Sequence, residues 1–476
     1  MTIRFLKPWN GYQPDAVVSG LTNEAALIAG GLASDDLDGG NDGRIYEAKF
    51  ATDASGNVTG LVGPDGVGYP VPTQRAARVA IMGDSIASQN TSTSATTNHK
   101  RLHGYLSWAL AFLGQPWEFT AADNFAVAGS TLGVILANQL PALKAAVQAG
   151  TRYQRVFISA GTNDTNASRA LADIKADYQA LFNGIRGLGA IPVCHGILPR
   201  GADASLTTAK KLNMQLNEWL AQQAEAGLIE FIDVGESVAD NSTAFGNALT
   251  TCMYDSGTVN LHPNARGAFL IGKAISAYYK ARGIAPGLKV ATQAGDVFDR
   301  TNNPYGSLYS NPLLQGGTTA PTGMSTSGGT WSKVNRTLDN GQVRTDCQCV
   351  LAASTTHYLY DDWVTTGDWA STELQPGDVI EARAIIAVTS GVNINAIYLK
   401  HTENDGVTAF DATDLHSADA GLPDGTYELH LKTPPITVRA YGGSGNASIF
   451  TRLDVVTAAG ASGTAVVKAF EARRIS

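Results

Sequence analysis

The segment Ala77-Arg78-Val79-Ala80-Ile81-Met82-Gly83-Asp84-Ser85-Ile86 decides the fold of the central part of this chain. An apolar run ends abruptly in Gly-Asp-Ser, and a helix-compatible segment follows. Such a transition delivers a serine hydroxyl to the carboxyl edge of a parallel sheet, where open α/β folds hold their ligand sites. Ser85 is therefore a candidate nucleophile, provided that a base can reach it.

A histidine that suits the role of base lies far downstream, in Asn260-Leu261-His262-Pro263-Asn264, just before an apolar helical pattern over residues 267–281. A neutral imidazole activates serine by taking its proton, so His262 is the candidate base. A carboxylate or a carbonyl oxygen must fix the tautomer of that imidazole. Asp255 is the nearest upstream carboxylate and a backbone carbonyl is the alternative. The sequence leaves both open.

Two further apolar runs end in groups that can donate hydrogen bonds. Residues 124–129 end in Gly129, and residues 155–159 lead into Gly161-Thr162-Asn163-Asp164. A glycine lets a backbone N–H approach a substrate closely, and an asparagine amide donates without adding charge. An ester carbonyl under attack develops an oxyanion, which such preorganised donors stabilise.

These four segments resemble the SGNH (GDSL-type) hydrolase family, named for Ser, Gly, Asn and His in four sequence blocks, over about residues 76–282. The resemblance implies an α/β/α domain with a parallel sheet that hydrolyses esters, with Ser85 as nucleophile and His262 as base. It also implies an oxyanion hole. The donors of that hole are the backbone N–H groups of Ser85 and Gly129 and the amide of Asn163. The family usually has Asp three residues before the His, where this chain has Val259, so assigning Asp255 to the triad departs from the pattern.

Composition limits the classes of protein to which the chain can belong. Charged residues make up 16% of the 476 residues, glycine occurs 51 times, and the formal net charge is −8. This charge argues against a general nucleic-acid binder, and no segment approaches the ~20 apolar residues of a membrane span. Residues 1–9 have no signal-peptide core, so we expect synthesis in a bacterial cytoplasm without standard secretion. The four cysteines include no Cys-x-x-Cys pair, so we expect reduced thiols and neither metal nor cofactor.

Three regions follow from shifts in pattern: a small N-terminal module at 1–72, the hydrolase-like domain at 73–285 and a β-rich region at 286–476. In the middle region strands alternate with helical patterns, which predicts a parallel sheet. The predicted helices are 132–148, 171–188, 209–226 and 267–281, and the predicted strands are 77–83, 124–129, 155–159, 191–196 and 228–234. The polar run 88–98 is expected to be flexible and to overhang the site.

From about residue 286 the pattern changes to short strands between Gly, Asp and Pro turns, which predicts a β-sandwich. The predicted strands are 379–388, 394–399, 427–431, 436–441, 448–456 and 465–475. Asn311-Pro312-Leu313-Leu314, with the later Trp331, resembles the entry of jelly-roll carbohydrate-binding modules, and the resemblance implies glycan binding. The candidate rings for stacking on sugars are Tyr358, Tyr360, Trp363 and Trp369. Packing in the core is the alternative role for these rings.

The N-terminal module carries a second, shorter resemblance. Arg-Phe-Leu-Lys-Pro-Trp-Asn-Gly-Tyr at 4–12 and Ala-Leu-Ile-Ala-Gly-Gly-Leu-Ala at 26–33 resemble leader segments of bacteriophage structural proteins. We therefore predict a phage tail esterase that removes O-acetyl groups from a bacterial surface polysaccharide, with a homotrimer and other virion proteins as expected partners. Two alternatives stay open: a lipid esterase, thioesterase or lysophospholipase, and a non-catalytic glycan-binding adhesin.

Overall fold

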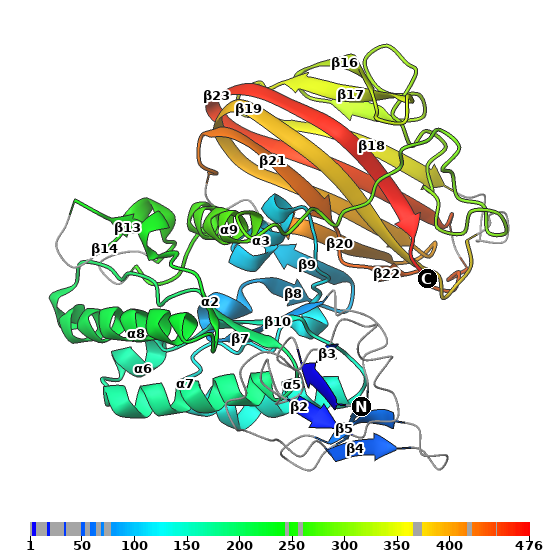
Figure 1. The fold of residues 1–476 in the computed structure, drawn as a ribbon. Helices are drawn as coiled ribbons and strands as arrows, with labels where there is room; N and C mark the ends of the chain where they lie inside the picture. Colours follow the sequence, from blue (N-terminus) through cyan, green and yellow to red (C-terminus); the bar gives the residue numbers. More distant parts are fainter. Residues whose placement is uncertain are drawn as a thin grey trace. The chain divides into compact units, whose positions relative to one another are not determined.

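The computed structural model (Figure 1) describes residues 78–242, 247–255, 260–364, 374–416, 421–443 and 445–476, together with six short N-terminal strands. The chain forms two compact units, described separately below. Unit 1 is Met1–Ser88 with Ala122–Gly235, and unit 2 is Gln89–Ala121 with Glu236–Ser476. The domain boundaries predicted from the sequence at residues 73 and 285 stay predictions.

The six N-terminal strands form two small antiparallel sheets. They are β1 (Thr2–Phe5), β2 (Val17–Ser19), β3 (Ala33–Ser34), β4 (Lys49–Thr52), β5 (Val58–Val62) and β6 (Gly68–Pro70). Strand β1 pairs with β2 and β3, and β5 pairs with β4 and β6. Residues 22–31, with N-cap residues at their start and two glycines at their end, are predicted from the sequence as a short helix, which lies outside the described residues.

Unit 1 contains the predicted parallel sheet. Its strands, in hydrogen-bonding order, are β12 (Glu230–Phe231), β11 (Ile191–Cys194), β10 (Arg155–Ser159) and β7 (Val79–Gly83). All five residues of β7 are buried, as expected for a continuous apolar run. Residues 124–129, predicted as a strand, instead form irregular chain, of which 124–127 run beside β7. The Phe125 N–H donates to the Ile81 carbonyl (2.9 Å) and the Val127 N–H to the Gly83 carbonyl (3.1 Å).

Helices follow the strands of unit 1 along the chain, as predicted. They are α2 (Ser85–Ser88), the 3₁₀ turn η1 (Ala121–Asp123), α4 (Leu132–Val134), the π-helical turn η2 (Ile135–Gln139), α5 (Leu140–Gln148), α6 (Thr162–Asn166), α7 (Leu171–Arg186), the 3₁₀ turn η3 (Ala204–Leu206) and α8 (Thr207–Glu225). None of the described helices is long and apolar enough to cross a membrane.

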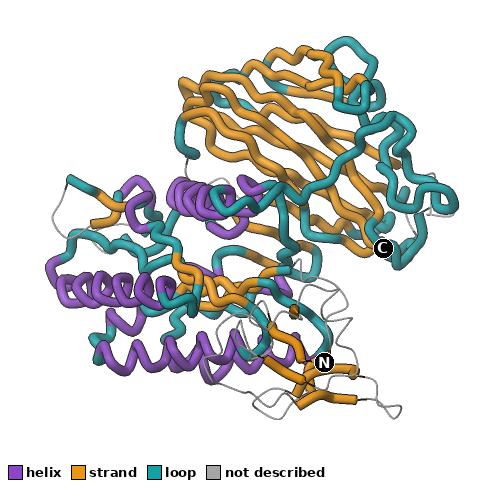
Figure 2. Tube along the Cα trace, viewed as in Figure 1, coloured by secondary structure: helices purple, strands orange, loops and turns teal. Residues whose placement is uncertain are grey.

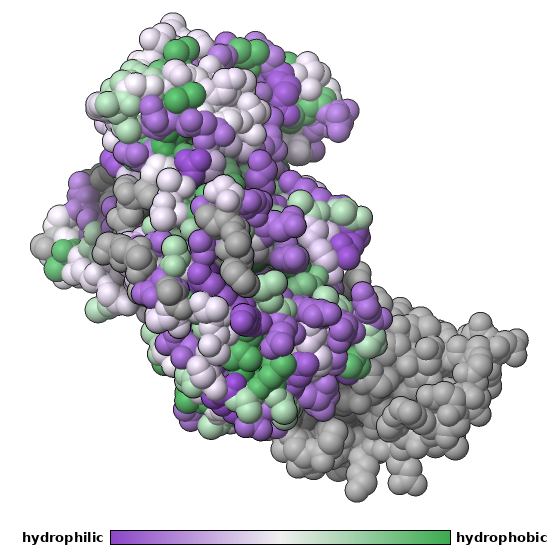
Figure 3. Space-filling model, turned by 90° about the vertical axis from the view of Figure 1, so that its left-hand side faces the viewer, coloured by the Kyte–Doolittle hydropathy of each residue, from purple (hydrophilic) through white to green (hydrophobic). Residues whose placement is uncertain are grey.

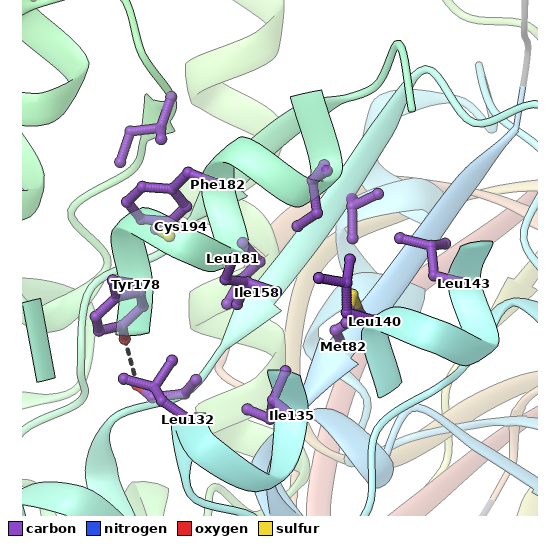
Figure 4. Packing of buried hydrophobic residues seen from close by; sticks show 14 of the residues in the cluster. Met82, Leu132, Ile135, Leu140, Leu143, Ile158, Tyr178, Leu181, Phe182 and Cys194 are labelled. Carbon is purple, nitrogen blue, oxygen red and sulfur yellow. Dashed lines mark hydrogen bonds between the residues drawn. The ribbon is translucent and has the colours of Figure 1, made fainter. Parts of the chain in front are cut away.

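The core of unit 1 lies between the sheet and these helices (Figure 4). Helix α7 presents Tyr178, Leu181 and Phe182, at the spacing of one helical face, toward Met82 and Ile158 of the sheet. Apolar residues are thereby removed from the surface. On the face of the molecule shown in Figure 3, the remaining hydrophobic residues are scattered in small groups among hydrophilic ones.

Unit 2 contains the predicted all-β region, in which strands dominate (Figure 2). The main path of its sheet, in hydrogen-bonding order, is β15 (Ser325–Ser327), β18 (Thr356–Val364), β23 (Ser448–Arg474), β19 (Val379–Asn404), β20 (Ala409–His416), β9 (Thr97–Arg101) and β8 (Thr91–Thr93). The strands off this path are β16 (Thr330–Thr337), β17 (Val343–Val350), β21 (Gly425–Lys432) and β22 (Ile436–Thr437). The smaller elements are α3 (Tyr105–Leu113), η4 (Gly235–Ser237, at the junction with unit 1), β13 (Ala239–Asp240), β14 (Asn247–Ala248), η5 (Thr250–Cys252) and α9 (Ala265–Lys280).

Strands β19 and β23 are each continuous where the sequence predicts two separate strands. They pair with each other along most of their length, and the register shifts between Thr389 and Val392 and again before Ala396. The residues that the sequence predicts to form turns therefore form β-bulges within a continuous strand. A bulge bends a strand without ending it.

The polar run after Ala87 forms regular strands, so its prediction as flexible chain is wrong, whereas its position over the site stays a prediction. It forms the hairpin β8–β9, and β9 pairs in parallel with β20. The Lys100 side chain is buried, with its Nζ 2.8 Å from the Lys432 carbonyl and 3.8 Å from Asp414 Oδ2. Burial lowers the pKa of Lys100, and Asp414 opposes that shift. Residues 89–121 thus fold with strands more than 300 positions away.

Candidate active site

The turn that presents Ser85 depends on two neighbouring residues. Gly83 has a φ of 145°, and a Cβ on it would lie 2.0 Å from the Ser159 carbonyl oxygen, so only glycine fits there. The Asp84 N–H donates to that same carbonyl (3.0 Å), and Asp84 Oδ1 accepts the Ile86 N–H (2.9 Å). Ser85 is thereby placed at the carboxyl end of β7, as the first residue of α2.

Asp84 is completely buried beneath this turn. Burial, together with the nearby Asp164 carboxylate, raises the pKa of Asp84 from 3.8 to about 7, against hydrogen bonds from backbone N–H groups that lower it. Asp84 Oδ2 has no hydrogen-bond partner among the described residues. The carboxyl group is therefore half protonated near neutral pH.

We expect Asp84→Asn to stabilise the protein more at pH 8 than at pH 4. Between about pH 4 and pH 7 the folded state keeps a proton that the unfolded state has lost. The stability that Asp84 contributes is therefore present below pH 4 and lost as the pH rises through about 7. A shift of about three units corresponds to at most about 4 kcal/mol, and Asn cannot ionise. Urea unfolding of both proteins at the two pH values measures the difference, and an identical difference at both would contradict the prediction.

The two other expected oxyanion donors lie in unit 1, Gly129 in a loop and Asn163 at the start of a helix that contacts this loop. Gly129 is exposed and has a φ of 79°. Asn163 is the second residue of α6, and its Nδ2 donates to the Ser130 carbonyl (2.9 Å). An amide nitrogen carries two hydrogens, so one N–H of Asn163 holds the loop and the second remains for a substrate oxygen. The buried Asp164 carboxylate accepts the Leu132 N–H (3.0 Å) and holds the same loop from its other side.

His262 and Asp255 lie together in unit 2. The Nδ1 atom of His262 is 3.0 Å from both carboxylate oxygens of Asp255. Asp255 Oδ2 also accepts the backbone N–H groups of Leu261 (2.8 Å) and His262 (2.6 Å). Helix α9 begins just beyond, with the Asn264 side chain capping the Gly267 N–H (3.0 Å). Of the two partners left open by the sequence, the carboxylate is the one in contact with the imidazole.

The charge of Asp255 suits this contact. Burial acts to raise the pKa of Asp255, but the hydrogen bonds from the His262 side chain and from the two backbone N–H groups lower it below its ordinary value. Asp255 is therefore ionised at neutral pH. A carboxylate on Nδ1 holds the imidazole in the tautomer whose Nε2 can accept a proton, and it stabilises the imidazolium that then forms.

Tyr254, which was not among the residues predicted from the sequence, lies beside this pair. Its side chain is 53% exposed, its ring centroid lies 5.5 Å from that of His262, and it stacks on His103 at 6.0 Å. A tyrosine directly before the candidate acid was the available signal. The exposed ring extends the surface beside His262.

The structure thus groups the candidate residues in two sets. Ser85, Gly129 and Asn163 belong to unit 1, whereas Asp255 and His262 belong to unit 2. Within each set the local geometry suits the predicted chemistry. The approach of His262 to Ser85 stays a prediction.

The candidate sugar-stacking residues divide differently. Tyr358 and Tyr360 are half-buried on β18. Trp363 belongs to the same strand, but its side chain lies outside the described part of the structure, as does all of Trp369.

Comparison with known proteins gives one family match and several similar folds. Three solved structures illustrate the similarity. TesA is 18% identical over 44% of this chain and 99% of its own (TM-score 0.32). A GDSL-like lipase from Bacteroides thetaiotaomicron is 14% identical over 44% and 87% (TM-score 0.29). A carbohydrate-binding module of the β-sandwich superfamily is 18% identical over 32% and 56% (TM-score 0.20). No curated protein matches the chain significantly.

The family match covers the segments from which the site was built. Residues 81–268 match the GDSL-like lipase/acylhydrolase family. The matched range begins inside β7 and ends inside α9, so it includes all five candidate catalytic and oxyanion residues. The central part of the chain, residues 81–268, is therefore similar to the GDSL-like lipase/acylhydrolase family and has an SGNH-like fold with a parallel sheet.

Proposed function

We propose that this protein is a serine esterase that removes O-acetyl groups from a bacterial surface polysaccharide. Ser85 Oγ bonds to the ester carbonyl carbon while its proton passes to His262 Nε2, and the oxyanion accepts hydrogen bonds from Ser85, Gly129 and Asn163. The same proton then leaves with the sugar hydroxyl. Water, deprotonated by His262, releases acetate from Ser85.

The observation that carries the esterase chemistry is the His262–Asp255 pair. Because Asp255 occupies Nδ1 at 3.0 Å, the remaining ring nitrogen, Nε2, is the one that can take a serine proton. A glycan-binding adhesin without catalysis has no need of an ionised carboxylate on this histidine.

A polysaccharide substrate is supported by one face of the all-β region. Tyr358 and Tyr360 alternate along β18 and so point to the same side, with ring centroids 5.7 Å apart. Phe450 lies 5.6 Å from the Tyr360 ring, and the Arg452 guanidinium lies over Tyr358 at 4.9 Å. These four residues and Lys400 form what we call the tyrosine face. Its rings are half-buried, so part of each remains accessible.

Charged groups continue the tyrosine face onto the neighbouring strands. Lys400 is paired directly opposite Arg452, so both side chains lie on the same side of the sheet. Arg452 binds Asp454 (2.8 Å) and Lys400 binds Asp411 (2.8 Å), so the positive charges are balanced. Accessible aromatic rings suit the apolar face of a sugar, and the bordering charged groups can exchange hydrogen bonds with its hydroxyls.

The same proposal assigns the protein to a phage tail, where it acts as a homotrimer with other virion proteins. Its support is the resemblance of the N-terminal segments to phage leader sequences. The alternative substrate class is lipid, which the description of the matched family as lipases and acylhydrolases favours.

Two measurements separate these substrates. We expect the protein to release acetate from purified O-acetylated polysaccharide and little fatty acid from phospholipid. Tyr360→Ala is expected to lower kcat/KM on the polysaccharide by about threefold to tenfold, the size of one aromatic contact, and to leave hydrolysis of a small aryl acetate unchanged.

Tyr305→Ala is the matched control, because Tyr305 is an exposed tyrosine of the same unit with Arg474 over its ring at 5.9 Å. It should leave both activities unchanged. Faster release of fatty acid than of acetate would overturn the polysaccharide proposal, and equal losses on both substrates in Tyr360→Ala would overturn the binding role of the tyrosine face.

A further inference from the structure

Gln139 is a buried polar residue of unit 1 to which the reaction described above gives no role. It is the last residue of the π-helical turn η2, between α4 and α5, and it is 2% exposed. A π turn holds one residue more than an α turn and often marks a functional site. Each residue of an α-helix rotates the chain by about 100° about the helix axis. Without the extra residue, the Gln139 side chain would therefore point about 100° away from its present direction.

All the hydrogen-bonding groups of the Gln139 amide are used. Its Oε1 accepts the Gly83 N–H (2.8 Å), and its Nε2 donates to the Gly83 carbonyl (2.8 Å) and to Ser130 Oγ (3.2 Å). Gly83 precedes Ser85 by two residues, and Ser130 directly follows Gly129. One side chain therefore connects the backbone before the nucleophile to the loop that carries the second oxyanion donor.

Gly129 depends on such a connection because it is exposed and no described residue beyond its chain neighbours lies where its side chain would be. An added Cβ at Gly129 would find no heavy atom within 4 Å, and the residue is exposed. The direction of its N–H is therefore set by its neighbours in the chain. The following residue, Ser130, is held by Gln139 at its Oγ and by Asn163 at its carbonyl.

The geometry points to Gln139 as a positioning residue of the oxyanion hole, an inference that rests on the proposed esterase function. The N–H groups of Ser85 and Gly129 must converge on one developing oxyanion. Gln139 sets the spacing between the two backbone segments that carry them. Donors of this kind act by being fixed in place before the reaction, so a small displacement costs much of their effect.

Two variants test this role. Gln139→Met keeps the length of the side chain and removes its hydrogen bonds, whereas Gln139→Glu keeps the acceptor for the Gly83 N–H and loses the donors. We expect both to lower kcat for a small aryl acetate by about 10- to 100-fold, somewhat less than the loss of a complete oxyanion donor, with KM changed less than about threefold.

Asn217→Leu is the matched control. The Asn217 amide bonds to both backbone groups of one residue, as Gln139 does: it accepts the Ile197 N–H (2.7 Å) and donates to the Ile197 carbonyl (3.0 Å). Asn217 lies on α8, however, and contacts neither Gly83 nor Ser130 through these bonds. Its loss should lower the melting temperature by an amount similar to that of Gln139→Met while leaving kcat within about twofold of the wild type.

Binding of phenylboronic acid distinguishes positioning from general loosening of the fold. The serine oxygen adds to boron to give a tetrahedral anion that mimics the oxyanion intermediate. Its Ki should rise in both Gln139 variants by the same factor by which kcat/KM falls, and stay unchanged in Asn217→Leu.

An unchanged Ki, or an equal fall of kcat in Asn217→Leu, would overturn the role of Gln139 while leaving the esterase intact. A wild-type protein that neither hydrolyses the aryl acetate nor binds the boronic acid would overturn the proposed function together with this inference.

Discussion

Ser85→Ala is expected to abolish ester hydrolysis, lowering kcat on the order of 10⁴- to 10⁶-fold, because the substitution removes the attacking oxygen. The protein should remain folded. Asp84 keeps its hydrogen bonds in the variant: its N–H donates to the Ser159 carbonyl, and its Oδ1 accepts the Ile86 N–H. Turnover of a small aryl acetate and the melting temperature measure the two effects.

A matched control lies one helical turn away. Ser88 is also a half-buried serine of α2, and its hydroxyl donates to the Ser85 carbonyl (3.0 Å). Ser88→Ala should keep activity within severalfold of the wild type. A fluorophosphonate should label Ser85 in the wild type and in Ser88→Ala, and label nothing in Ser85→Ala. Ester turnover in a protein whose Ser85 stays unlabelled would refute the assignment of the nucleophile.

Asp255→Asn carries the second largest expected effect, a loss of kcat on the order of 10⁴-fold. The carboxylate at 3.0 Å accepts the Nδ1–H of His262 and so selects the tautomer with its basic lone pair on Nε2, the atom that takes the serine proton. An asparagine amide can instead donate to Nδ1, which selects the tautomer with its proton on Nε2. That imidazole cannot act as a base toward Ser85.

The control for this substitution is Asp240→Asn, also in unit 2. Asp240 accepts the backbone N–H of Ser242 (3.0 Å), much as Asp255 accepts that of His262, but it is half-buried on β13 and also accepts the Ser242 hydroxyl (2.6 Å). It should leave kcat unchanged. A loss below about tenfold in Asp255→Asn would show that the carboxylate does not orient the catalytic imidazole.

The central fold was readable from the sequence because its signals are local. Strand β10 falls at 155–159 as predicted, since an apolar run buried on both faces needs no knowledge of its partners. Helix α7 begins at Leu171 as predicted, because its apolar positions recur with the helical period. The four blocks around Ser85, Gly129, Asn163 and His262 lie in the matched family range for the same reason. Their residue types follow strand ends that the pattern reveals.

Tertiary structure alone decided the features that depend on distant partners. The sequence of the polar hairpin β8–β9 predicts a flexible loop. The structure pairs it with β20, more than 300 residues away, and buries Lys100 against Asp414. In the sequence, Gln139 is one polar residue within a predicted amphipathic helix. In the structure, the π turn directs its side chain at Gly83 and Ser130. Local hydrophobic period determines which segments become strands and helices. Each buried polar side chain bonds to particular backbone N–H and carbonyl groups, and these often lie in segments far apart in the chain. No local sequence pattern records such pairings.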